Sequence, residues 1–143
     1  MDTYLSVQGE AITSEELRIP KAREVVYALQ LDAIPFVRLV ECRRLPESSH
    51  AEVIVFDVEV ELGQRQIHDI HQYERLAAIF DRNDTTSPEV LALRADFPRV
   101  PHLNLRKDEL PRSLCLFEEP YSELKLRWTA TAFLERIRVC FVE

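Results

Sequence analysis

Hydrophobic and polar positions alternate most regularly between residues 52 and 62. Every second position there is apolar: Ile54, Phe56, Val58, Val60 and Leu62. Successive side chains of a β-strand point to opposite faces, so the pattern predicts a strand with one buried face. We expect the other face to be solvated and acidic, with Val53 and Val55 among its glutamates and aspartate: Glu52, Asp57, Glu59 and Glu61.

Three shorter segments predict further strands beside this one. Residues 36–40 and 76–80 are apolar runs, and residues 66–73 continue the alternation between them. Clusters of turn-forming residues close the first run at 45–49 and the last at 81–84. Together these segments predict an antiparallel meander of about four strands.

Helical spacing replaces this alternation near both ends of the chain. Apolar side chains recur at helical spacing over residues 25–29, and Ser14 ahead of two glutamates is typical of a helix N-cap. Pro20 lies between them, so either a first turn ends just before it or Pro20 opens a second helical start. We expect this helix to end near Leu31 and an amphipathic helix to begin near Thr129.

The order of these segments predicts an α+β domain. Its parts are an N-terminal helix, the meander, a long proline-rich loop and a C-terminal helix. We interpret residues 1–13 as an N-terminal arm and residues 14–143 as one domain. The chain stops at Glu143 without a helix-terminating signal, so we expect the domain to be part of a longer polypeptide. Residues 97–111 carry three prolines, and long irregular segments of this kind often hold functional residues.

Composition narrows the functional classes. The chain has 25 acidic and 18 basic side chains and a net charge of −7, which argues against a nucleic-acid partner. It contains no apolar run long enough to span a bilayer and no leader pattern, so we expect neither a membrane partner nor export. The three cysteines are widely spaced and odd in number, which favours a reducing, cytoplasmic location.

The sequence predicts no cofactor and no metal. Only two glycines are present, too few for a glycine-rich phosphate loop. His68 and His71 are three positions apart in an expected strand, where they would face opposite sides, so we interpret them as surface residues.

Three short motifs in the second half of the chain resemble those of ubiquitin-conjugating (UBC-fold) domains, especially the divergent bacterial family associated with ThiF-like adenylating enzymes and JAB-type peptidases. They are Pro101-His102-Leu103-Asn104, Ser113-Leu114-Cys115-Leu116-Phe117 and Trp128-Thr129-Ala130. The bacterial relatives have Pro-His-x-Asn, then Leu-Cys-Leu, then a Trp-Thr pair ahead of an amphipathic helix. The resemblance spans roughly residues 20–143.

The resemblance implies a catalytic site at Cys115, His102 and Asn104. A thiolate can accept an acyl group from another thioester, so Cys115 would carry a ubiquitin-like modifier or related acyl group. Asn104 could donate a hydrogen bond to the developing oxyanion, and His102 could orient the loop or act as a base. The implied partners are a ThiF-like activating enzyme or fused domain, a ubiquitin-like protein and a JAB-type peptidase. The bacterial relatives suggest a role in antiphage defence or protein modification.

Simpler interpretations stay open for the same residues. Cys115 lies among apolar residues and could be a small buried side chain, as free cysteine often is. The domain would then be a catalytically inactive UBC-like module that binds other proteins, or an unrelated small α+β binding domain. We assign Cys42 and Cys140 to packing and Trp128 to a core position at the start of the last helix.

Overall fold

Six antiparallel strands form one sheet within the residues that the computed structural model describes, 3–30, 34–46, 51–60, 72–84, 87–97, 112–114 and 120–140. The strands are β1 (Glu10–Ile12), β2 (Val37–Arg44), β3 (Glu52–Glu59), β4 (Tyr73–Phe80), β5 (Glu89–Ala92) and β6 (Arg112–Leu114). The helical elements are η1 (Ser14–Glu16), α1 (Pro20–Gln30), α2 (Tyr121–Leu124), η2 (Lys125–Arg127) and α3 (Ala130–Cys140). The strands are ordered in the sheet as they are in the chain.

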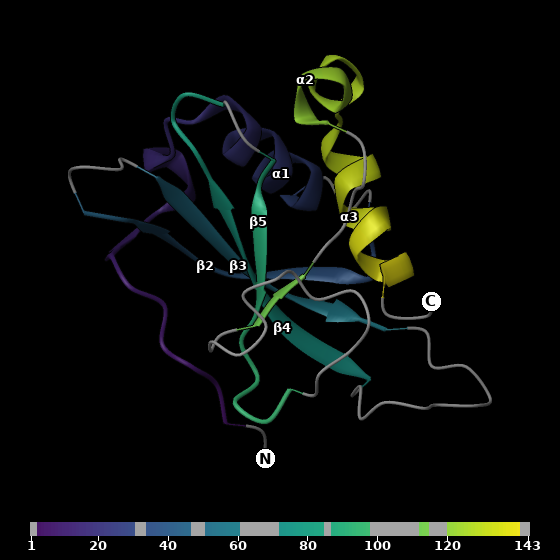
Figure 1. The fold of residues 1–143 in the computed structure, drawn as a ribbon. Helices are drawn as coiled ribbons and strands as arrows, with labels where there is room; N and C mark the ends of the chain where they lie inside the picture. The colour runs from purple at the N-terminus through teal and green to yellow at the C-terminus, as the bar shows by residue number, and fades with distance from the viewer. Residues whose placement is uncertain are drawn as a thin grey trace.

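This architecture confirms the predicted α+β fold. The N-terminal helix, the antiparallel meander and the C-terminal helix are all present, and the helices lie on the same side of the sheet (Figure 1). The expected run at 76–80 is the second half of β4. Part of the segment interpreted as an arm pairs with β2 as β1. Residues 66–71 of the expected strand 66–73, and residues 98–111 of the expected loop 97–111, lie outside the described residues.

The start of the first helix follows local capping chemistry. Thr13 precedes the single turn η1, and its backbone N–H donates to the Glu16 carboxylate at 3.0 Å. The cap is therefore one residue earlier than the predicted Ser14. Of the two roles considered for Pro20, the structure shows the second, because α1 begins there. A proline fits the first position of a helix, since its fixed φ is helical and it has no N–H to leave unpaired.

The main core lies between the sheet and its helices. Fully buried side chains from β3, α1 and α3, including Phe56, Val25 and Phe133, form one continuous cluster there. Trp128 is half-buried against this cluster, with its ring 5.6 Å from that of Phe133. Its predicted position in the core at the start of the last helix is confirmed.

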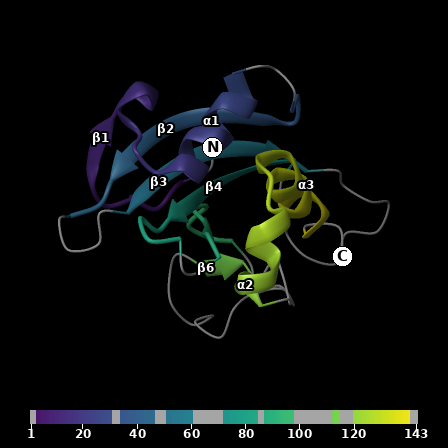
Figure 2. The same ribbon diagram turned by 90° about the horizontal axis from the view of Figure 1, so that it is seen from above.

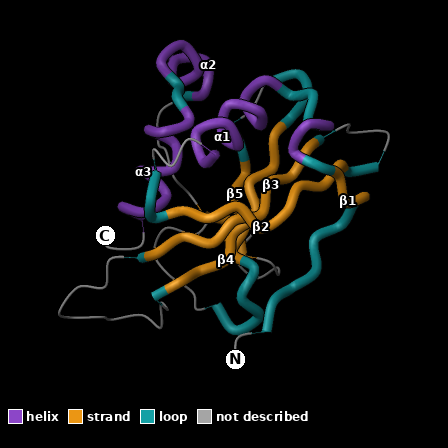
Figure 3. The backbone as a smooth tube through the Cα atoms, turned by 180° about the vertical axis from the view of Figure 1, so that it is seen from behind, coloured by secondary structure: helices purple, strands orange, loops and turns teal. Residues whose placement is uncertain are grey.

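A smaller apolar cluster occupies the other face of the sheet. Its buried members are Val53, Val55, Ala77 and Leu93. The N-terminal segment 3–9 covers part of this cluster: Val7 packs on it, and the Leu5 N–H donates to the Leu93 carbonyl at 2.7 Å. Figure 3 shows this segment from behind, leading from the N-terminus to β1.

Gly9 permits the N-terminal segment to pass close to β2. Its φ is +103°, in the left-handed region, and a Cβ placed on it would lie 2.5 Å from the Arg44 carbonyl oxygen. A side chain at this position would be strained twice, once by the backbone conformation and once by the contact.

The expectation of a solvated acidic face on the long central strand is wrong. Glu52 shares the parity of Ile54 and Phe56, and it is 0% exposed. Asp57 is also largely covered, because Arg75 pairs with it at 2.8 Å. Val53 and Val55 place buried apolar surface on the second face, and only Asp57 and Glu59 there are partly exposed.

No helix within the described ranges is both long and apolar enough to cross a membrane.

Candidate functional site

The last strand of the sheet leads directly to the expected nucleophile. Leu114 is 3% exposed and pairs with Val90, while Arg112 pairs with Ala92. This register means that β6, labelled in Figure 2, runs towards the end of the sheet that carries the β4–β5 connection. Leu114 thus fixes the position of the chain immediately before Cys115.

The three residues predicted to form the catalytic site, Cys115, His102 and Asn104, lie outside the described residues. The flanking residues are described on each side. Phe97 is 2% exposed at the start of the interval that contains His102 and Asn104. Tyr121 opens α2 shortly after Cys115. The described residues on either side of these positions show how the chain enters and leaves the expected site.

A buried ion pair fixes the chain ahead of Phe97. The Arg94 Nη2 atom lies 2.9 Å from Glu74 Oε2, and both side chains are 0% exposed. The Arg94 guanidinium also lies 2.9 Å from Asp96 Oδ1 and stacks over the Phe97 ring at 5.6 Å. Removing either partner of such a pair leaves a buried charge uncompensated, so the pair holds β4 and the residues after β5 in one arrangement.

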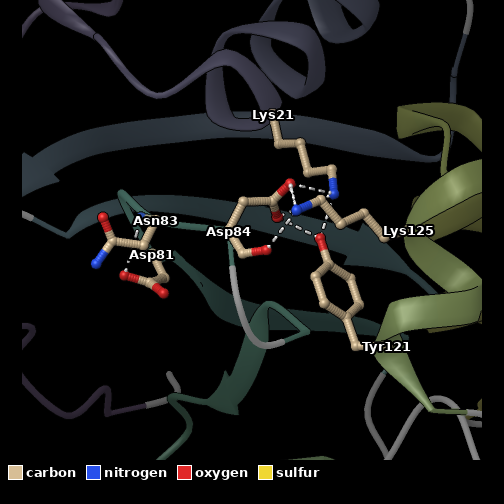
Figure 4. A network of polar contacts seen from close by, with 6 residues as sticks. All are labelled: Lys21, Asp81, Asn83, Asp84, Tyr121 and Lys125. Atoms are coloured by element: carbon tan, nitrogen blue, oxygen red, sulfur yellow. Dashed lines mark hydrogen bonds and ion pairs between the residues drawn. The ribbon is translucent and has the colours of Figure 1, made fainter.

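A charged cluster fixes the chain after Cys115 (Figure 4). Lys21 Nζ, at the start of α1, donates to both carboxylate oxygens of Asp84 at 2.9 Å. The Tyr121 hydroxyl donates to Asp84 and accepts from Lys21. Lys125 Nζ donates to the backbone carbonyl oxygen of Asp84 at 3.0 Å. Lys21, Asp84, Tyr121 and Lys125 thus connect α1, the β4–β5 connection, α2 and η2. We call these four residues the Asp84 cluster.

The cluster sets the protonation of its own members. Burial opposes ionisation of Asp84, but hydrogen bonds from Tyr121 and Lys21 and the charges of Lys21 and Lys125 outweigh it. The pKa of Asp84 therefore lies below its ordinary value of 3.8. Burial and the Asp84 carboxylate both raise the pKa of Tyr121 above its ordinary 10.0. At neutral pH the carboxylate is ionised and the phenol keeps its proton, so Tyr121 serves as a donor.

Backbone geometry turns Asp84 towards the helices. Asp84 has a φ of +53°, in the left-handed region, which aspartate tolerates better than most residues. Lys21 Nζ also lies 4.6 Å from the Tyr121 ring centre and 5.2 Å from the Trp128 ring centre. Two aromatic faces and one carboxylate thus compensate the half-buried ammonium group.

No sequence pattern predicted the Arg94–Glu74 ion pair or the Asp84 cluster. Glu74 and Arg94 are far apart in the chain, and neither position breaks a pattern. Lys21, Asp84 and Tyr121 belong to three elements whose association depends on the tertiary fold. The turn at 81–84 was predicted, and aspartate in a turn is ordinary, so nothing marked Asp84 as the centre of a network.

The expected packing role of Cys42 is confirmed. Its side chain is 3% exposed in β2. Burial, together with the charges of Glu52, Glu41 and Glu15, raises the pKa of the Cys42 thiol to about 11. A thiol with this pKa is almost entirely protonated at neutral pH and is a poor nucleophile. Cys140 belongs to α3, but its side chain lies outside the described part of the structure.

Metal ligands do not gather in the described part of the chain. No group of three or more His, Cys, Asp or Glu side chains there could hold a metal ion, and His68 and His71 fall outside it.

Comparison with protein families gives a match over most of the chain. The model described as prokaryotic E2 family A matches residues 41–141. This range begins within β2 and includes β3 to β6, α2, α3 and the sequence positions of His102, Asn104 and Cys115. No curated protein and no solved structure gives a significant match.

Proposed function

The chain belongs to prokaryotic E2 family A, and from this membership we propose that it carries a ubiquitin-like modifier, or a related acyl group, as a thioester on Cys115. The single observation that carries the proposal is the family match, whose range contains all three residues of the expected site. The pairing and burial of Leu114 hold the backbone next to Cys115 in place, as an active-site cysteine requires.

The proposed reaction is a transfer between thioesters. The modifier's C-terminal carboxyl would arrive as a thioester on a ThiF-like activating enzyme. The Cys115 thiolate would attack that carbonyl, form a new C–S bond and release the enzyme's thiolate. An amine of the acceptor would then attack the Cys115 thioester, form an amide and release the Cys115 sulfur. The overall free-energy change of the first step is small, since one thioester replaces another.

Asn104 and His102 have separate proposed roles. The tetrahedral intermediate carries negative charge on oxygen, and an Asn104 amide donor would stabilise it by about 3 kcal/mol if well placed. His102 would orient the loop or take the proton from the attacking amine.

The properties of Cys42 make it a poor alternative to Cys115 as the nucleophile. With a pKa of about 11, the Cys42 thiol has roughly one thiolate in ten thousand molecules at pH 7, and its side chain is buried. Cys42 is thus unsuited to acyl transfer by both reactivity and access. Cys115 stands in the position that the family resemblance assigns to the nucleophile.

We propose a ThiF-like enzyme, or a fused ThiF-like domain, as the donor, and a JAB-type peptidase as an associated partner. The competing possibility is a catalytically inactive docking module of the same fold. That module would keep the fold and the partner but form no adduct.

Two linked measurements test the relay. First, the native protein is treated with a thiol reagent and mapped by peptide; we expect labelling of Cys115 and protection of Cys42 until the protein is unfolded. Second, the protein is incubated with ATP and a ThiF-like enzyme and ubiquitin-like protein from the same organism. We expect an adduct that dithiothreitol removes.

Variants define the outcome. Cys115→Ala should form no adduct, Cys115→Ser should form an ester that resists dithiothreitol, and Cys42→Ala should behave as the wild type. Protection of native Cys115 together with binding of the ThiF-like enzyme but no adduct would contradict the relay and support the docking module.

A further inference from the structure

A pocket on the helical side of the sheet is lined by three arginines. It has a volume of about 330 Å³. It lies beside the start of α1, where β2 ends, β3 begins and β4 ends. Its lining residues are Arg18, Ile19, Pro20, Arg44, Glu52 and Arg82. We call it the arginine pocket. It contains none of the residues proposed for acyl transfer.

The only acidic residue that lines the pocket is already neutralised. The Glu52 carboxylate accepts hydrogen bonds from the backbone N–H groups of Arg18 at 2.9 and 3.0 Å and of Ile19 at 2.7 Å. Arg44 Nη2 adds an ion pair at 3.1 Å. Glu52 is 0% exposed. This carboxylate therefore orients the backbone of residues 18 and 19 and the Arg44 side chain. These donors compensate its negative charge.

The two remaining arginines make no ion pair in the described part of the structure, although the charge of the exposed Glu16 beside the pocket attracts Arg18. Arg18 and Arg82 are exposed, and within the described residues neither side chain makes an ion pair or hydrogen bond. Three guanidinium groups against one carboxylate give the lining a formal charge of +2. Nearby acids lie outside the lining: Glu16 is exposed on η1, and Asp81 belongs to the β4–β5 turn. The lining of this pocket is therefore positively charged in a chain whose net charge is −7.

We propose that the arginine pocket binds a tetrahedral oxyanion, specifically a phosphate group. A planar guanidinium presents paired N–H donors that match two phosphate oxygens, and a charge of +2 matches a phosphate dianion. The positive end of the α1 dipole at Pro20 adds to the attraction. A divalent cation would meet three positive charges and a carboxylate with no vacant position. The volume exceeds that of a phosphate group alone, so a phosphomonoester fits as well as inorganic phosphate.

An amide-resolved titration tests the pocket. The ¹⁵N-labelled protein is titrated with inorganic phosphate, and separately with sodium chloride at matched ionic strength, since charge attraction at an exposed site is screened by salt. We expect saturable shifts at the backbone amides of Arg18, Ile19 and Arg82 with phosphate only. Phosphoserine is titrated in parallel: tighter binding than phosphate identifies an esterified ligand, and equal or weaker binding identifies a free anion.

Substitutions locate the binding site. Arg18→Ala and Arg82→Ala should each weaken phosphate binding about fivefold, and the double variant should lose it. Neither substitution removes a contact that holds the fold, because Arg18 contacts Glu52 only through its backbone N–H and the Arg82 side chain is exposed. Arg38→Ala is the matched control: its side chain is 81% exposed on β2, away from the pocket, and binding should be unchanged. Shifts that do not saturate, or equal phosphate affinity in the Arg82→Ala and Arg38→Ala proteins, would overturn the proposal.

The two proposals fail separately. The titration requires neither Cys115 nor a ThiF-like enzyme, so loss of phosphate binding leaves the relay untouched, and a missing thioester leaves the pocket untouched.

Discussion

Replacement of Glu52 should destabilise the protein far more than replacement of any surface glutamate. Glu52 is 0% exposed, and its two oxygens accept from two backbone N–H groups and one guanidinium. These contacts attach the chain ahead of α1 to the first residue of β3. Glu52→Ala removes every acceptor at once and leaves the donors of Arg18, Ile19 and Arg44 facing an apolar side chain.

The expected loss follows from the cost of unsatisfied donors. A buried donor without a partner costs about 1–3 kcal/mol. Ile19 is 6% exposed, whereas Arg18 is exposed and Arg44 is half-buried. All three line the arginine pocket, through which water can reach part of the freed donors. We therefore expect Glu52→Ala to lower the free energy of unfolding by about 3 kcal/mol. Glu52→Gln keeps one acceptor oxygen but turns an amide donor towards existing donors, so it should cost about half as much.

Urea unfolding followed by fluorescence of Trp128, the single tryptophan, measures this loss. With a urea m-value of about 2 kcal/mol/M, the midpoint should fall by about 1.5 M. Glu24→Ala is the control, because Glu24 is exposed on α1, and it should change stability by less than about 0.5 kcal/mol. If Glu52→Ala were no more destabilised than Glu24→Ala, the assignment of Glu52 as a structural anchor would be wrong.

Two further predictions concern protonation. Burial raises the pKa of the Cys42 thiol to about 11, so a thiol reagent at pH 8 should label Cys42 only as fast as the protein opens. Labelling should accelerate in urea below the unfolding midpoint. Fast labelling of the native protein would contradict the burial of Cys42. Asp84 has a lowered pKa in the folded protein, so its ionised form contributes stability that is present above the ordinary value of 3.8 and is lost as the pH falls through the lower folded value. The stability difference between wild type and Asp84→Asn should accordingly be largest near neutral pH and shrink below about pH 4, and a difference that does not vary with pH would show that the carboxylate charge has no part in the cluster.

The elements themselves could largely be predicted, because they depend on local patterns. Alternation marked β3, and helical spacing marked α1 and α3. Turn residues separated β2 from β3 and marked the end of β4. The short strands were not predicted: β1 and β6 have three residues each and β5 has four, too few to show a period. They form because β2, β4 and β5 offer them edges to pair with.

Side-chain roles were harder to predict where the chain folds onto both faces of the sheet. Glu52 was grouped with the acidic face of the alternating strand, although its even position places it on the same face as Ile54 and Phe56. Its burial depends on the N–H groups of Arg18 and Ile19, which tertiary packing brings to it. The Asp84 cluster and the Arg94–Glu74 pair depend on long-range contacts in the same way. The site at Cys115, His102 and Asn104 stays a prediction from sequence resemblance.

The N-terminal segment also constrains the order of events during synthesis. Each strand of the meander pairs with its neighbour in the chain, so those hairpins close short loops and form early. Residues 3–5, by contrast, bond to Leu93 and Ala95, nearly ninety positions later. At ribosomal rates of about 5–20 residues per second, the first residues wait roughly 5–20 seconds for their partners to emerge. Val53 and Val55 on the nascent sheet lack the covering segment from their own synthesis until Leu93 and Ala95 emerge, so this apolar patch stays exposed for the later part of that interval.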